Sequence, residues 1–226
     1  MDRKDSTIVR QARSEVTRRK IIDAAVELFN DVGYTGTGLG DIVARTGMTK
    51  GALYHHFNSK EALAVAIINE GAEALVKSYQ GINRSSAPAL ESMIHGMLVI
   101  VDLANTDKLV RTAAVLQRIL AESSEASTIN YNAWLAETGA QVRRAQAEGD
   151  LRPDIDPQAA GDFIVSAMLG AELISNAVSG RQDWLERVTK MWEFLLSAVA
   201  SEQSLPYLRE FLARESLRRQ SQSTPT

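Results

Sequence analysis

Apolar residues recur at steps of three and four along most of this chain, and this spacing limits the fold more than any other feature of the sequence. In the first such segment, the apolar residues that share one helical face are Ile21, Ile22, Ala25, Leu28 and Phe29. The alternation with a period of two that is typical of half-buried strands is scarce. We therefore expect an all-α protein in which each helix buries one apolar face.

Glycine, proline and short polar residues divide the chain into helical segments. Gly33 and Gly47 suit the turns that end helices, and Pro157 suits the first turn of a helix. Side chains fit to cap helix starts are Thr37, Thr49 and Asp107. The predicted helices cover about residues 16–33, 39–45, 50–57, 59 to at least 67, 85–103, 107–121, 128–148, 158–178, 183–201 and 206–216. We expect the polar tail from Arg218 to fray.

Composition excludes several classes of site. None of the 226 residues is cysteine, which excludes disulfides, thiolate metal sites and cysteine catalysis. No apolar stretch approaches the roughly 20 residues that cross a bilayer, so we expect no membrane partner. The charged start, Met1–Asp5, lacks the apolar segment of a secretory signal. The sequence therefore indicates a cytoplasmic protein.

Charge is distributed unevenly between the two ends of the chain. Residues 1–60 carry ten Lys/Arg and seven Asp/Glu, a net charge of +3, whereas the remainder carries 15 and 21, a net charge of −6. This division suggests a polyanion-binding domain over 1–60, with 1–14 flexible, joined to a larger domain over 61–226. A basic face that is simply solvated is the alternative interpretation.

Three short helices within about 45 residues, with Thr46-Gly47-Met48 between the last two, match a helix-turn-helix. To read DNA, the last helix must present small and polar groups to base edges at its N-terminal end. Residues of this kind are Thr49, Lys50, Gly51 and Ala52. An ordinary helical hairpin with a solvated Lys50 is the alternative.

The run from Ile42 to Glu61, IVARTGMTKGALYHHFNSKE, resembles the signature of TetR-family repressors, and AAVELF at 24–29 and Gly33-Tyr34 also match. The resemblance covers about residues 17–63 and implies DNA binding. It implies base contacts from Thr49, Lys50, Gly51 and Ala52. It implies contacts with the DNA backbone from Thr37, Tyr54, His55 and Lys60, and we expect added grip from Arg18, with Arg13 and Arg19.

The pair His55-His56 does not predict a metal site. Adjacent helical residues point about 100° apart, and the sequence offers no third ligand nearby. We therefore expect no metal and no cofactor.

An ordered series over about 125–200 resembles the γ-butyrolactone autoregulator receptors, a subfamily of TetR-like repressors. The matching residues are Tyr131, Trp134, Glu148–Arg152, Asp156-Pro157, Val165, Gly170, Ser179–Arg181, Met191-Trp192 and Leu195-Leu196. The resemblance implies that Trp134 lines a ligand cavity, where an indole offers an apolar wall and one N–H donor. The other predicted ligand-binding residues are Tyr131, Gln117, Val165 and Leu169. From spacing alone, core packing is the alternative role for these aromatic residues.

Two residues depart from the receptor pattern. Leu169 stands where those receptors typically have a threonine that can donate to the lactone, and Glu172 stands where a glutamine is common. Loss of a hydroxyl that pairs with a buried carbonyl costs about 1–3 kcal/mol of affinity. The resemblance implies a small apolar effector such as a γ-butyrolactone. The two departures favour a more apolar or differently shaped effector, such as an unrelated antibiotic, lipid or metabolite, or a receptor that no longer binds a lactone.

Two apolar stripes on the last long helices predict a dimer interface. Their residues are Phe163, Ala167, Gly170 and Ile174 on the first helix, and Val188, Met191 and Leu195 on the second. A self-complementary four-helix contact between two copies explains both stripes, and an internal core is the alternative. Two paired heads can reach major grooves about 34–36 Å apart.

These features predict a homodimeric repressor that binds a near-palindromic, double-stranded operator and is released by a small hydrophobic effector. A helical enzyme and a structural adaptor are the other classes considered. The sequence shows no set of nucleophile, base and orienting group for an enzyme. The acidic residues Glu148, Asp150, Asp154 and Asp156 sit around a turn, where we expect them to be solvated.

Overall fold

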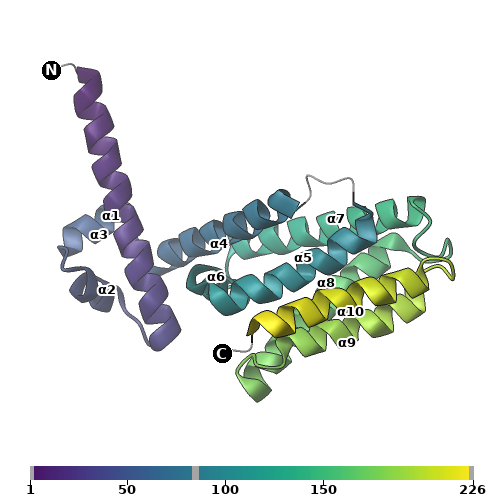
Figure 1. The fold of residues 1–226 in the computed structure, drawn as a ribbon. Coiled ribbons are helices and arrows are strands. Elements are labelled where there is room, and N and C mark those ends of the chain that lie inside the picture. The colour runs from purple at the N-terminus through teal and green to yellow at the C-terminus, as the bar shows by residue number, and fades with distance from the viewer. Residues whose placement is uncertain (1–2, 83–86, 224–226) are drawn as a thin grey trace. The chain divides into compact units, whose positions relative to one another are not determined.

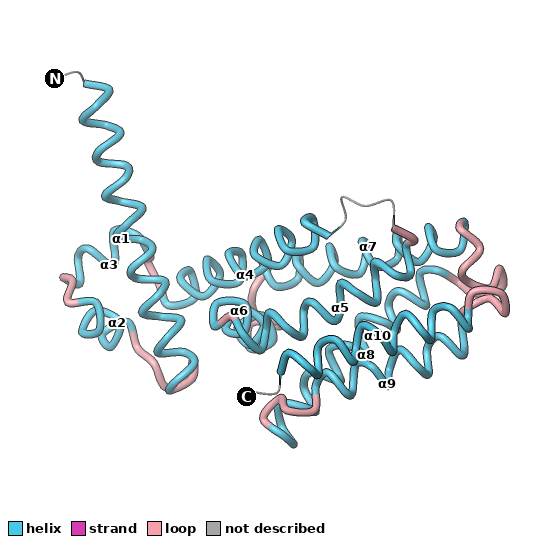
Figure 2. Tube along the Cα trace, in the orientation of Figure 1, coloured by secondary structure: helices cyan, strands magenta, loops and turns pink. Residues whose placement is uncertain are grey.

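The computed structural model describes residues 3–82 and 87–223, and this part of the chain forms ten α-helices (Figure 1, Figure 2). The expected all-α fold is confirmed. The helices are α1 (Arg3–Asp31), α2 (Leu39–Thr46), α3 (Lys50–His56), α4 (Lys60–Ile82), α5 (Ala89–Thr106), α6 (Lys108–Ile119), α7 (Glu125–Ala147), α8 (Pro157–Ser179), α9 (Trp184–Val199) and α10 (Leu205–Ser223).

Several helix starts are built as the sequence predicts. The side chain of Thr49 accepts the backbone N–H of Ala52 at 3.2 Å, and that of Asp107 accepts the N–H of Leu109 at 2.8 Å. Pro157 occupies the first turn of α8. Each cap satisfies an N–H group that has no partner within its own helix. The boundaries of these helices therefore follow from local chemistry.

Two helices are longer than predicted. Helix α1 begins at Arg3 rather than near Val16, since residues 3–15 contain no glycine or proline to stop it. Helix α10 continues to Ser223 because Arg219 is buried and its Nε donates to Asp102 at 2.8 Å. The expected frayed tail is therefore wrong as far as Ser223. The predicted flexibility of 1–14 stays a prediction, and the predicted helix start at Ser85-Ser86 lies outside the described residues.

By packing, the chain divides into two compact units, residues 1–74 with 107–128, and residues 75–106 with 129–226. The first unit thus joins the helix-turn-helix segment to α6, which comes later in the chain. The predicted domain boundary at residue 60 concerns function, and it stays a prediction.

The first unit has one apolar core to which α1, α2, α3, α4 and α6 all contribute. Fully buried side chains in it include Ile21 of α1, Ile42 of α2, Leu53 of α3, Leu63 of α4 and Leu116 of α6. Helix α6 is also tied to α1 by polar contacts. Lys108 Nζ donates to Glu27 at 2.6 Å, and the Asn30 amide donates to the hydroxyl of Thr112.

Helices α4 and α6 are in close contact at Gly71. A Cβ atom added to Gly71 would lie 2.3 Å from the Cβ of Ala113, far inside van der Waals contact. A glycine at this position therefore fixes the separation of α4 and α6, because any side chain would push them apart.

In the second unit, α5, α9 and α10 pack against one another, and α8 packs on α9. Figure 1 shows α10, in yellow, running alongside α9. Trp184 and Trp192 of α9 are buried in the core, with Leu98 of α5 and Leu208 of α10. An isolated antiparallel bridge pairs Leu151 with Ala200 and joins the loop before α8 to the end of α9.

We expect Gly71→Ala to lower the free energy of unfolding by about 1–3 kcal/mol, because the new methyl overpacks the contact with Ala113. The double variant Gly71→Ala with Ala113→Gly removes the opposing methyl and should recover much of the loss. Gly40→Ala is the matched control, since a Cβ at Gly40 meets no atom within 4 Å. Urea unfolding followed by circular dichroism measures all four proteins. Equal stability of Gly71→Ala and Gly40→Ala would contradict the close contact.

Candidate nucleic-acid interface and effector-binding unit

The turn between α2 and α3 has the geometry of a helix-turn-helix. Gly47 ends α2 in the left-handed conformation, with φ of 67°, and its N–H donates to Val43 O at 3.0 Å. A residue with a β-carbon disfavours this conformation. Thr49 then starts α3. Buried Ile42 and Leu53 hold the two helices on the core.

The outer face of α3 presents most of the residues predicted to meet DNA. Lys50, Gly51 and His55 are exposed, and Tyr54 is 53% exposed despite its large aromatic ring. Ala52 is half-buried, next to the exposed group. A small backbone-rich surface is thus flanked by a cation and a phenol, groups that donate to bases and phosphates.

Thr37 is placed differently from the expectation. It is 2% exposed, and its hydroxyl donates to Gly33 O at 2.9 Å, inside the first unit. The N-cap of α2 is Gly38, and its N–H is satisfied by the carboxylate of Asp41 at 2.7 Å. The capping role predicted for Thr37 is therefore wrong, because the side chain turns inward. Its contact with phosphate stays a prediction.

Lys60 braces the loop between α1 and α2. Its ammonium donates to Tyr34 O at 2.9 Å and to Thr37 O at 3.0 Å, and it lies 4.3 Å from the centroid of the Tyr34 ring. These contacts attach the first residue of α4 to the loop that precedes α2. The predicted phosphate contact of Lys60 must therefore be shared with this internal role.

Arg18 connects α1 to two other helices. Its guanidinium forms an ion pair with Glu70 of α4 at 2.6 Å. It also lies 5.6 Å from the ring centroid of Phe57, the residue that ends α3. The sequence does not reveal the Glu70 contact, because the two partners are 52 positions apart.

The residues predicted to bind the ligand are divided between the two units. Tyr131 and Trp134 on α7, and Val165 and Leu169 on α8, belong to the second unit, whereas Gln117 on α6 belongs to the first. Val165 is buried, and the other four are half-buried. The structure thus places four of the five on two helices of one unit, and their role as a ligand site stays a prediction.

Glu172 is committed to an internal ion pair. Its carboxylate accepts from Arg181 at 2.6 Å, and both side chains are buried. The Arg181 guanidinium also donates to Ala104 O at 3.3 Å and lies 5.4 Å from the Trp184 ring centroid. Glu172 therefore helps, through Arg181, to hold the turn after α8 against α5.

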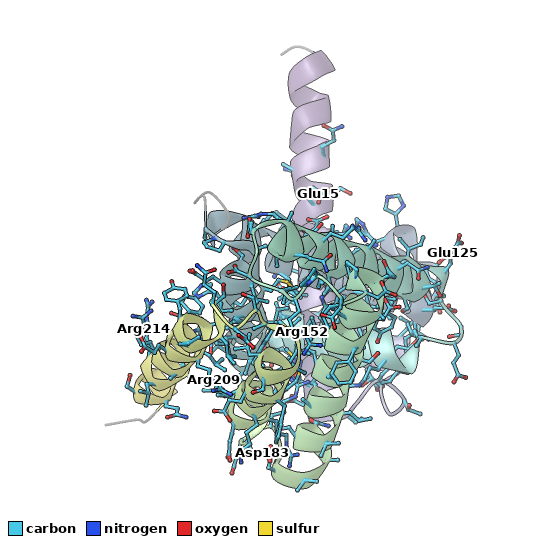
Figure 3. The ribbon with its side chains drawn as sticks, turned by 90° about the vertical axis from the view of Figure 1, so that its right-hand side faces the viewer. Glu15, Glu125, Arg152, Asp183, Arg209 and Arg214 are labelled. Atoms are coloured by element: carbon cyan, nitrogen blue, oxygen red, sulfur yellow. The ribbon has the colours of Figure 1, made fainter. Side chains whose placement is uncertain are left out.

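The same turn stores backbone strain. Arg181 has a φ of 77°, which is unfavourable for a residue with a long side chain. Beside it, Asp183, labelled in Figure 3, accepts hydrogen bonds from Ser175 at 2.5 Å and from Ser179 at 2.6 Å. Hydrogen bonds from Arg187 and from these hydroxyls hold the pKa of Asp183 well below its usual range. The Glu172–Arg181 ion pair and the hydrogen bonds to Asp183 hold the strained turn in place.

Trp184 and Trp192 were not among the predicted site residues. Both side chains are buried, and neither indole N–H has a partner among the described residues. The helical period is enough to place both residues on the inward face of α9, but it does not show that their indole N–H groups lack partners in the part of the chain that the structure describes.

The predicted dimer stripe is only partly on the surface. Phe163 is 59% exposed and Ile174 is exposed, with Ala167, Gly170 and Met191 half-buried between core and solvent. Val188 and Leu195 instead pack inside their own chain, because they face the other helices of the second unit. That part of the predicted interface is corrected. On α8 and α9, the exposed large apolar residues outside the predicted stripe are Leu173, Val178 and Phe194.

By length and composition, α8 is the one described helix that could cross a membrane, with a mean hydropathy of 1.2. The same composition occurs in interior helices of soluble proteins, and it is weak grounds for a membrane span. Among the described residues, no group of three or more histidine or acidic side chains is placed to hold a metal ion.

Comparison with known proteins gives consistent matches. Residues 21–67 match the family described as "Bacterial regulatory proteins, tetR family". The chain is 32% identical over 197 residues to the A-factor receptor protein of Streptomyces griseus, covering 85% of this chain and 67% of that one.

Two solved structures share the fold closely. A γ-butyrolactone receptor described as an ArpA-like protein has a TM-score of 0.76 and 25% identity, covering 91% of this chain and 99% of that one. CprB of Streptomyces coelicolor, solved in complex with its operator sequence, has a TM-score of 0.74 and 26% identity, with the same coverage.

Proposed function

Since this chain belongs to the TetR family of bacterial regulatory proteins and is a transcriptional regulator, we propose that it is a homodimeric repressor released from its operator by a small hydrophobic effector. The observation that carries this proposal is the exposed face of α3, set by the caps at Gly47 and Thr49. The relatives are regulators and not enzymes, and regulators of this family typically need no cofactor. We place this protein in the cytoplasm, where it has access to DNA.

In this proposal, α3 enters the major groove. Thr49, Lys50, Gly51 and Ala52 face base edges, because they occupy the N-terminal turn of the helix. Residues assigned to phosphate contacts are Arg18, Thr37, Tyr54, His55 and Lys60. Thr37 can contribute only with its backbone while its hydroxyl remains bonded to Gly33.

The exposed apolar face of α8 and α9 supports self-association. Regulators of this family act as dimers, and a second copy would cover Phe163, Ile174 and Val178 together with Phe194. Burying these side chains removes apolar surface from water, which is the main favourable term in such contacts. The apolar composition of α8 is then explained by a protein partner rather than by a bilayer.

For the effector, the likeness to γ-butyrolactone receptors supports a lactone with an apolar chain, bound near Trp134, Tyr131, Val165 and Leu169. Leu169 lacks a hydroxyl, and Glu172 is engaged by Arg181, so both offer less to a carbonyl than the receptor pattern does. This difference favours, as a second candidate, a more apolar effector of unrelated structure.

Effector binding must change the DNA-binding state to release the operator. A ligand shifts an equilibrium only by its difference in affinity for the two states. By reciprocity, operator DNA must lower the affinity for the effector by the same factor. We propose that the shift passes through α6 and α4, since both share the core of the first unit with α1, α2 and α3.

We expect Lys50→Ala with Tyr54→Phe to weaken operator binding by about 10- to 100-fold, since a base contact of this kind is worth about 1–3 kcal/mol. Duplexes are first selected from a random library with the parent protein. Binding is then measured by gel shift at physiological salt, with Arg214→Ala as the control for a lost charge, because Arg214 projects from α10 (Figure 3). Unchanged selectivity of the double variant would refute the assignment of α3.

We expect Phe194→Asp to convert the dimer to a monomer, because an unpaired carboxylate at the buried seam is strongly unfavourable. Sedimentation equilibrium measures the molecular mass. Leu217→Asp is the matched control, since Leu217 is similarly exposed but lies on α10. A Phe194→Asp protein that remains dimeric would place the interface elsewhere.

We expect an alkyl-substituted γ-butyrolactone to weaken binding of the parent protein to its selected duplex, and Trp134→Ala to abolish this response. Gel shifts with increasing lactone measure the response, and Trp184→Phe serves as a control for the loss of a tryptophan. Release by apolar antibiotics but not by the lactone would favour the second candidate.

A further inference from the structure

We propose that Glu70 acts as an internal competitor of DNA phosphate, and that it lowers the affinity of the protein for all duplexes by holding Arg18 and Arg19. This inference rests on the proposed function, because it assumes that Arg18 meets the DNA backbone. It adds a positioning residue outside the helix-turn-helix segment.

One carboxylate holds both arginines. Arg18 donates to Glu70 Oε1 at 2.6 Å, and Arg19 donates to Glu70 Oε2 at 3.3 Å. Arg19 also pairs with Asp23, one turn further along α1, at 2.8 Å. Two cationic side chains of α1 are thus balanced by two carboxylates before any DNA is bound.

Burial favours the pairing with Glu70. The Glu70 side chain is 20% exposed, whereas Arg18 is 36% exposed and Arg19 is 57% exposed. The carboxylate is therefore the more sheltered partner, and Coulomb attraction is stronger where water is partly excluded. Arg18 is further restrained by the Phe57 ring, 5.6 Å from its guanidinium carbon. The arginines keep enough exposed surface for an outside anion to reach them.

Carboxylate and phosphate oxygens offer a guanidinium the same kind of acceptor. Both accept two parallel N–H donors, so they compete for one planar fork. A phosphate contact by Arg18 must therefore replace or share the bond to Glu70. The energy of that exchange reduces the gain from the new contact, and it does so equally for every base sequence.

The test compares two variants at position 70 with a matched control elsewhere. Glu70→Gln keeps the shape of the side chain and removes its charge, whereas Glu70→Asp keeps the charge and shortens its reach. Glu15→Gln also removes one negative charge from the first unit, but Glu15 is exposed and forms no ion pair with any side chain that the structure describes. Glu70→Gln is also tested in an Arg18→Ala, Arg19→Ala background.

Dissociation constants are measured for the selected duplex and for a random duplex over a range of salt concentrations. We expect Glu70→Gln to tighten binding to both duplexes about 3- to 10-fold at physiological salt, and Glu70→Asp to tighten it less. Glu15→Gln should change binding by less than about 2-fold. The slope of log K against log salt should become steeper by about 1 in Glu70→Gln, because one more phosphate contact is made at full strength. The tightening should vanish in the double-alanine background.

Several outcomes would overturn the inference. Equal effects of Glu70→Gln and Glu15→Gln would reduce the role of Glu70 to general charge. Weaker binding by Glu70→Gln in a protein with an unchanged melting temperature would show that Glu70 supports DNA binding instead. If the Glu70→Gln protein does not fold, the same comparison with Glu15→Gln is made for Glu70→Asp. Failure of the proposed function is separate, because the parent protein would then not prefer its selected duplex over a random one.

Discussion

The surface that we propose to face DNA depends on the contact that α6 makes with α1 and α4. Ala113 meets Gly71 without room for a further methyl, and the Asn30–Thr112 and Lys108–Glu27 contacts hold the same helix to α1. Helix α6 thereby completes the core on which α2 and α3 rest. The surface of α3 is therefore positioned by packing against the core of the first unit, and not only by the turn before α3.

Four cationic residues of α1, α3 and α4 fall into two groups with different physical roles. Lys60, Arg18 and Arg19 are bound to carbonyl or carboxylate groups of the protein itself. Lys50 projects from the exposed start of α3. Internal bonds orient the first group, and they also reduce what that group can offer to DNA. The same internal bonds therefore fix the orientation of these side chains and lower the affinity that they contribute to DNA binding.

Features governed by local chemistry were predictable from the sequence, whereas contacts between distant residues were not. The helical period gave the elements, and Thr49 and Asp107 marked two helix starts because capping involves only the next few residues. The link between Arg219 and Asp102 spans 117 positions, so the full length of α10 was not visible. On α9, both Val188 and Phe194 are apolar, and only the packing distinguishes the buried residue from the exposed one.

Helix α4 has three fixed points along its length: Lys60 at the loop before α2, Glu70 facing α1, and Gly71 facing α6. Each added or deleted residue turns an α-helix by about 100°. A single insertion between Lys60 and Glu70 would swing both later residues away from their partners at once. Insertions and deletions should therefore be tolerated in the loops. Between Lys60 and Gly71, by contrast, the number of residues must stay constant.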